Sequence, residues 1–138
     1  MKEKKIVLFL HSGNYEKLYH AVMLAITSAS MGNKVYIFLF FWALKKFVTD
    51  KLDVIEFPDG MQEEDRRLLE AVPQGQPNML KELLSEVSKM GNLEIYACSG
   101  AVKLMKLDEE LVKSKVDDII GLPTMLKMAE GAETQLFI

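Results

Sequence analysis

The chain contains a single cysteine, Cys98, which stands between an expected strand, 93–97, and an expected helix, 101–106. Backbone N–H groups at the start of a helix favour a negative charge, so this position favours the thiolate over the thiol. The thiolate is the form of cysteine that attacks sulfur. The small residues Ser99 and Gly100 follow, and they leave room for a reaction partner beside the sulfur. The alternative is that Cys98 packs as a small hydrophobic residue, as unpaired cysteines commonly do.

A histidine, His11, follows the first expected strand, 5–10, and is a candidate base for the thiol. A neutral imidazole can accept a thiol proton, and an imidazolium stabilises a thiolate beside it. The alternative is a loop histidine whose hydrogen bonds are satisfied by solvent or backbone. His20 lies within the first expected helix, away from its apolar stripe, and is expected at the surface. Because Cys98 and the two histidines lack the spacing of metal ligands, we expect no metal.

The residues after His11 form a loop with one glycine, Gly13, in front of an expected helix. Neither G-x-G-x-x-G nor G-x-x-x-x-G-K-[ST] occurs there, so the common phosphate-binding motifs are not supported. A loop with one glycine before a helix can still bind an anion, which leaves nucleotide or flavin binding open. Ser12 and Asn14 are the candidate contacts in that case. No motif of the chain calls for a cofactor.

Composition narrows the class of protein further. The 138 residues fit one domain, taken as 1–138, and 17 basic against 20 acidic residues give a net charge of −3. That mild acidity offers no basic surface for nucleic acid. A lone cysteine excludes an intrachain disulfide. The longest apolar run, 35–44, is about half of a membrane-spanning helix, and the apolar segment 6–10 is too short for a signal peptide. We therefore expect no membrane partner and a cytoplasmic location, where a thiol stays reduced.

Short apolar segments alternate with stretches that repeat apolar residues every three or four positions. The first kind predicts buried strands and the second predicts amphipathic helices. The expected strands are 5–10, 35–41, 93–97 and 134–138, with 53–57 as a short strand or an extended arm. The expected helices begin near Tyr15, at 62, after the capping residues Asn78 and Asp108, and at Pro123, with a loop at 73–77. This alternation predicts a three-layer α/β/α sandwich around a mainly parallel sheet.

Ligands and chemistry in such sheets collect at the carboxyl ends of the strands. Three segments meet this rule: the loop from His11, Phe41 with Trp42, and Cys98. We expect them along one edge of the sheet, although they are far apart in the sequence. Trp42 is expected at or near the rim, where it would join a pocket wall or a subunit contact. The section 45–77 is where an insertion or a lid would sit.

Several of these features together resemble the DsrE/DsrF-like family, which includes the TusD-type sulfur-relay subunits. The resemblance covers nearly the whole chain and rests on the order and spacing of its parts. These parts are an opening strand followed by a helix, Phe40-Phe41-Trp42, Tyr96-Ala97-Cys98 before a helix, Gly121-Leu122 before Met125-Leu126 and Ala129, and the strand 134–138. Cys98 falls where many members carry their cysteine.

The resemblance implies a compact α/β subunit with a five-stranded parallel sheet, commonly assembled into homo- or hetero-oligomers. In active members the matching cysteine accepts sulfur as a persulfide and passes it to the next protein, and here that role would belong to Cys98. The family assigns no role to His11, whose function as a base rests only on the shared edge. Because the chain has no second cysteine, the acceptor must be another molecule. The expected partners are a sulfur donor protein, an acceptor protein and further copies of the chain.

Three functions follow as hypotheses. The first is a cytoplasmic sulfur carrier or sulfurtransferase with Cys98 as its reactive group. The second is a module that binds a small ligand, a nucleotide or an acyl group, at the same edge, with an incidental thiol. The third is an assembly subunit whose apolar surface, with its many methionines, forms an interface.

Overall fold

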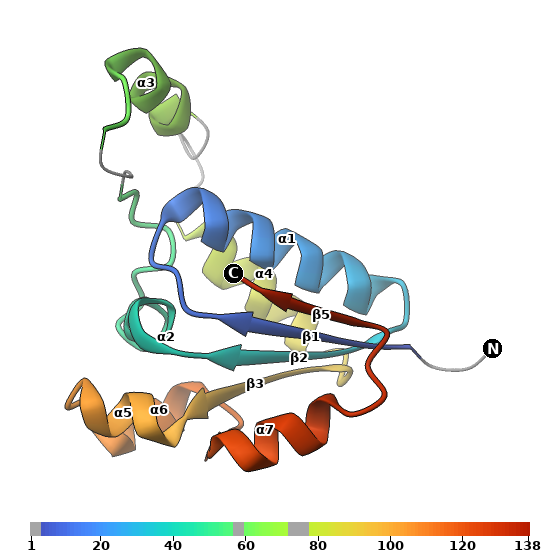
Figure 1. Cartoon of the computed structure of the whole chain (residues 1–138). Helices are drawn as coiled ribbons and strands as arrows, with labels where there is room; N and C mark the ends of the chain where they lie inside the picture. The colour runs from blue at the N-terminus through green and yellow to red at the C-terminus, as the bar shows by residue number, and fades with distance from the viewer. Residues whose placement is uncertain (1–3, 57–59, 72–77) are drawn as a thin grey trace.

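A computed structural model describes residues 4–56, 60–71 and 78–138 of the chain. At its centre lies a sheet of five parallel strands in the order β4-β3-β2-β1-β5 (Figure 1). The strands are β1 (Lys5–Leu10), β2 (Lys34–Leu39), β3 (Leu93–Cys98), β4 (Asp118–Ile120) and β5 (Thr134–Phe137). This sheet confirms the predicted α/β class and the five parallel strands that the family resemblance implied.

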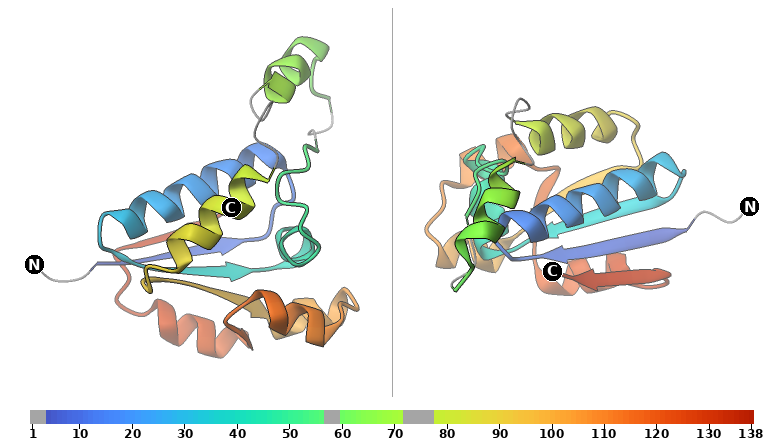
Figure 2. Two further views of the ribbon diagram at one scale, coloured as in Figure 1. Left: turned by 180° about the vertical axis from the view of Figure 1, so that it is seen from behind. Right: turned by 90° about the horizontal axis from the view of Figure 1, so that it is seen from above.

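Helices lie on both faces of the sheet and complete the three predicted layers. They are α1 (Tyr15–Ser30), α2 (Phe41–Val48), α3 (Glu63–Ala71), α4 (Met79–Ser88), α5 (Ser99–Leu104), α6 (Glu109–Lys115) and α7 (Leu122–Ala129). Helices α1 and α4 pack together on one face, while α5 and α7 lie on the other (Figures 1 and 2). Helix α2 packs against α6, and α3 stands apart from the sheet. None of the helices in the described ranges combines the length and apolar character needed to span a bilayer.

Side chains of the sheet alternate between its two faces, as a pleated strand requires. Ile37 and Ile95 share the apolar interior under α1 and α4. Phe38 and Tyr96, whose ring centroids are 6.1 Å apart, point the other way. Because Cys98 is two residues beyond Tyr96 in the same strand, its side chain also points away from α1 and α4.

The second strand is shorter than the sequence predicts. The expected strand 35–41 ends at Leu39, and helix α2 begins at Phe41 almost without a connecting loop. The turn is made by Phe41 itself, which has a φ of 44° in the left-handed region. A continuous apolar run does not distinguish a buried strand from a buried helix, and this one contains both.

The start of helix α4 also differs from the expectation. Asn78 precedes the helix as predicted, but it has a φ of 64° and its side chain makes no capping hydrogen bond. The carboxylate of Asp53 accepts hydrogen bonds there instead, from the N–H groups of Leu80 at 2.9 Å and Lys81 at 3.3 Å. Residues 53–56 form no strand, and the predicted loop 73–77 lies outside the described residues. The capping role predicted for Asp108 is confirmed by its bond from the Glu110 N–H at 3.0 Å.

Candidate functional site

The structure brings the three predicted segments to one edge of the sheet. Strands β1, β2 and β3 are parallel neighbours, with Leu10 opposite Leu39 and Leu39 opposite Ala97. The residues that follow these strands therefore lie side by side at their carboxyl ends. Strand order thus places the His11 loop, the start of α2 and Cys98 in one row, with the start of α2 in the middle.

Cys98 is the last residue of β3 and the N-cap of helix α5. It is 6% exposed and lies opposite Ile120 of the edge strand β4. A Cβ atom placed on the exposed Gly100 would lie 3.8 Å from the Cys98 sulfur. The buried sulfur therefore lies close to Gly100, which has no side chain to cover it.

Ser99 borders the turn between β4 and α7. Its hydroxyl lies 3.7 Å from the position that a Cβ atom on Gly121 would take, so the two residues pack closely. Gly121 therefore lies beside the residue that follows Cys98, a contact that was not predicted from the sequence. The available signal was topological, since Gly121 follows β4 and so also stands at a strand's carboxyl end.

His11 lies at the same edge, but the structure does not bring it next to Cys98. Strand β2 separates their two strands, and two strand spacings amount to about 10 Å between backbones. His11 is exposed, its N–H donates to the carbonyl of Ile138 at 2.8 Å, and its carbonyl accepts from Ala43 at 3.3 Å. Through these bonds, the backbone of His11 connects the end of β1 to α2 and to the last residue of the chain. A role for its imidazole as a base stays a prediction.

Gly13 and Trp42 form a close contact between the β1–α1 loop and helix α2. A Cβ atom on Gly13 would lie 2.9 Å from the Trp42 Cβ, which is closer than real Cβ atoms approach. Trp42 is nevertheless 60% exposed, which agrees with its predicted position at the rim of the sheet edge. In the same loop, the Ser12 hydroxyl accepts a hydrogen bond from the Asn14 N–H at 3.1 Å. Ser12 therefore stabilises the loop through a hydrogen bond that its hydroxyl oxygen accepts from Asn14.

The buried Lys46 holds helix α2 against this loop. Its ammonium donates to the carbonyls of Gly13 and Val54 and pairs with the Glu56 carboxylate at 3.4 Å. Lys46 is only 6% exposed, and these partners offset the cost of burying its ammonium group. This lysine was not predicted from the sequence. Its role depends on segments eight and thirty-three residues away, and no local spacing reveals that.

A hollow of about 430 Å³ opens beside this contact. Its lining includes Asn14, Trp42, Lys45, Lys46, Thr49 and Lys51. The structure thus joins two of the predicted binding residues, Asn14 and Trp42, on one concave surface. Ser99 and Gly100 lie apart from it, beside Cys98, so the predicted edge contains two distinct surfaces.

The parallel three-layer α/β fold with one cysteine at the carboxyl end of β3 places the chain among small α/β proteins with a single cysteine. The sequence profile of the DsrE/DsrF-like family matches residues 4–134 of the chain. The protein belongs to this family. No curated protein matches the chain.

Among solved structures, the ychN protein from E. coli is similar to this chain. The two share 14% sequence identity and superpose with a TM-score of 0.61, over 99% of this chain and 100% of the other. At that identity the similarity concerns the fold. It agrees with the parallel sheet and the two helical layers described above.

Proposed function

We propose that the protein is a sulfur carrier that holds a persulfide on Cys98 and passes it to a partner protein. The observation that carries the proposal is the position of Cys98 at the carboxyl end of β3 in a chain of the DsrE/DsrF-like family. The same strand edge is where parallel α/β folds place their chemistry. The unsubstituted Gly100 beside the sulfur supports the proposal, because it leaves an approach for the donor.

The exchange needs only thiolates and one mobile sulfur atom. The Cys98 thiolate attacks the outer sulfur of a donor persulfide, so that a new S–S bond forms and the donor leaves as a thiolate. An acceptor thiolate then attacks the same outer sulfur, and the Cys98 thiolate is released. No net oxidant is consumed in either step. Since Cys98 is the single cysteine, donor and acceptor are both separate molecules.

Burial of Cys98 restricts the loading step, in which the inner sulfur must reach the donor, more than the release step, in which the outer sulfur reacts. The inner sulfur is nearly enclosed, at 6% exposure of the residue. A transferred sulfur adds a bond of about 2 Å, which moves the electrophilic atom outward, past Gly100. The enclosed inner sulfur is then shielded from attack, which directs the acceptor to the outer one. The cytoplasm is the compartment we propose, because a lone thiol stays reduced there.

We also propose that the protein assembles with copies of itself. Three large apolar side chains on α7 and β5 are exposed: Leu122 at 52%, Leu126 at 60% and Phe137 at 69%. Large apolar side chains that are exposed in this way are typical of contact surfaces when they lie together. Sedimentation of wild type and of Leu126→Lys tests this assembly. A smaller species in the variant supports it, and a wild-type monomer at all concentrations overturns it.

Intact-protein mass tests sulfur transfer directly. After treatment with glutathione persulfide, wild type should gain the mass of one sulfur atom. Cys98→Ser and Cys98→Ala should gain none, while Ser99→Ala should gain it as wild type does. Two cysteine variants are used because a hydroxyl and a methyl perturb a buried position differently. Wild type that stays unmodified, or cysteine variants that are still modified, would overturn the proposal.

A further inference from the structure

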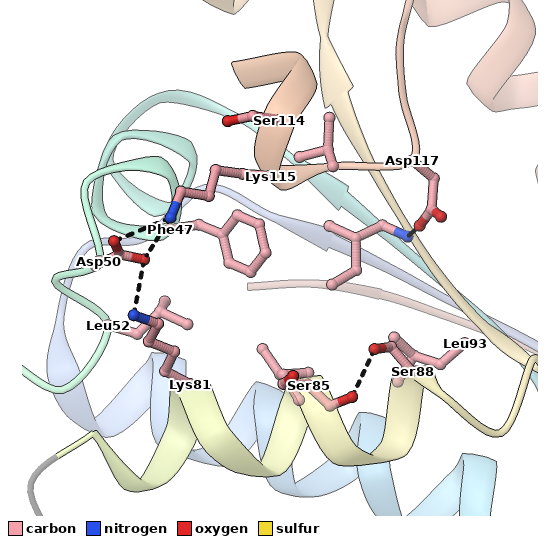
Figure 3. Close-up of a pocket in the computed structure, with 13 residues that line it drawn as sticks. Phe47, Asp50, Leu52, Lys81, Ser85, Ser88, Leu93, Ser114, Lys115 and Asp117 are labelled. Carbon is pink, nitrogen blue, oxygen red and sulfur yellow. Dashed lines mark hydrogen bonds and ion pairs between the residues drawn. The ribbon is translucent and has the colours of Figure 1, made fainter. Parts of the chain in front are cut away.

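A second hollow, separate from the cysteine edge, lies between helices α4 and α6 above strand β3 (Figure 3). Its volume is about 380 Å³, within the range of small-ligand pockets. It exists because β4 is short: β4 pairs with β3 only from Tyr96 to Cys98, so on that side of β3 no strand of the described residues lies beside Leu93. The hollow is on the face covered by α4, whereas the Cys98 side chain points to the opposite face.

The floor of this hollow is apolar. Leu84 of α4 and Leu93 and Ile95 of β3 form it, and each is at most 6% exposed. Phe47 and Leu52 add further apolar surface where α2 ends. Because this floor is already buried, the gain comes from the ligand: a hydrocarbon chain that lies on the floor removes its own apolar surface from water.

One end of the hollow is positively charged. Asp50 lies between two lysines, with its carboxylate 3.3 Å from the Lys81 ammonium and 3.0 Å from that of Lys115. Hydrogen bonds from Lys115 and Lys81 lower the pKa of Asp50, so its carboxylate stays ionised at neutral pH. Two ammonium groups therefore share the Asp50 carboxylate, so that two positive charges face one negative charge among the lining residues at this end.

The opposite end of the hollow is negative. Asp117 lies across the floor from the two lysines (Figure 3), and its carboxylate accepts the Ile95 N–H at 2.7 Å. A ligand with one negative group fits this arrangement when that group lies beside Lys81 and Lys115. A second negative group at the far end of such a ligand would be repelled by Asp117.

We propose that this hollow binds a small amphipathic monocarboxylate, with its carboxylate beside Lys81 and Lys115 and its hydrocarbon chain on the floor of Leu84, Leu93 and Ile95. Charge-assisted hydrogen bonds from ammonium groups hold a carboxylate in a defined position. The chain contributes through burial, so that affinity rises with chain length. This site is independent of the sulfur chemistry at Cys98, and binding is unaffected by loss of the thiol.

Calorimetric titration with a homologous series tests the ligand class. Butanoate, hexanoate and octanoate should bind with affinities that rise about fourfold for each added methylene group. Octanedioate should bind more weakly than octanoate, because its second carboxylate meets Asp117. Octyltrimethylammonium should not compete with octanoate. Absence of saturable octanoate binding, or equal affinity for octanoate and octanedioate, would overturn the proposal.

Matched variants test the place of binding. Lys115→Gln should weaken octanoate binding about tenfold, because it removes one charge-assisted hydrogen bond. Lys113→Gln makes the same change on the same helix outside the hollow, and should bind as wild type does. Ser85→Leu fills the hollow without changing its charge and should abolish binding, while Cys98→Ala should leave it unchanged. Equal effects of the two lysine variants, or full binding by Ser85→Leu, would contradict the assignment.

Discussion

The carboxylate of Asp53 caps helix α4 from outside the helix, accepting the backbone N–H of Leu80 at 2.9 Å. The helix's own N-cap residue, Asn78, contributes no side-chain hydrogen bond. The segment that follows α2 is therefore tied to the helix that precedes β3. This link therefore ties together two parts of the chain that connects β2 to β3.

Replacing Asp53 should weaken this cap measurably. Asp53→Ala leaves two N–H groups of α4 without a partner, and should lower the free energy of unfolding by about 1 kcal/mol. Asn78→Gly should be nearly neutral, because Asn78 makes no cap bond and glycine adopts its φ of 64° freely. Urea unfolding of both variants checks the pair. A neutral Asp53→Ala together with a destabilised Asn78→Gly would reverse the assignment.

The contact between Gly13 and Trp42 should make position 13 of the β1–α1 loop intolerant of any side chain. Gly13→Ala places a Cβ atom 2.9 Å from the Trp42 Cβ, so α2 must shift, at a cost of about 1–3 kcal/mol in stability. Gly100→Ala is the matched control, since its Cβ makes only an ordinary contact at 3.8 Å. Chemical denaturation should show a loss for the first variant and no loss for the second. Equal stabilities would contradict the close packing.

Tyr96 should make stability depend on pH in the alkaline range. Burial, followed by the nearby Glu94 carboxylate, raises the pKa of Tyr96 from 10.0 to about 12. Between these values the folded protein keeps a proton that the unfolded chain releases, so stability falls as pH rises. Tyr96→Phe removes this contribution, and its unfolding free energy should decline less steeply above pH 10.0. Parallel declines in the two proteins would show that the phenol titrates alike in both states.

Gly100 should control access to the Cys98 sulfur. Gly100→Leu places a large side chain where a Cβ atom would already lie 3.8 Å from the sulfur, and should slow persulfide loading several-fold. Helix α5 tolerates the change, because leucine is a better helix former than glycine. Intact-protein mass spectra of samples quenched at successive times measure the loading rates of wild type, Gly100→Leu and Gly100→Ala. A Gly100→Leu protein that loads as fast as wild type would place the approach to sulfur elsewhere.

Much of the fold was predictable because its strands and helices have strong local patterns. The alternation of apolar runs with amphipathic stretches predicts the layers, and glycine, proline and Asp108 mark several ends correctly. The end of β2 was mispredicted, because Phe41 turns the chain with a φ that aromatic residues rarely adopt. A bulky side chain such as that of Phe41 does not indicate a left-handed backbone conformation in the sequence.

The candidate site was predictable only in part, for a different reason. Parallel topology alone places His11, Trp42 and Cys98 at one edge, and that inference needs no side-chain detail. Contacts between distant segments decide the rest, as when Lys46 joins α2 to Gly13 and Asp53 caps α4. Periodicity is a property of one element at a time, and it contains no signal for such contacts.

The most direct test of sulfur transfer through Cys98 follows one sulfur atom through a complete cycle. Protein loaded by glutathione persulfide is separated from the donor and mixed with a small-molecule thiol, and the intact mass is recorded before and after. Wild type should gain one sulfur atom, located on the peptide that contains Cys98, and should return to its original mass as the thiol becomes a persulfide. A protein that never gains the atom, or that carries it on a peptide without Cys98, would contradict the proposed function.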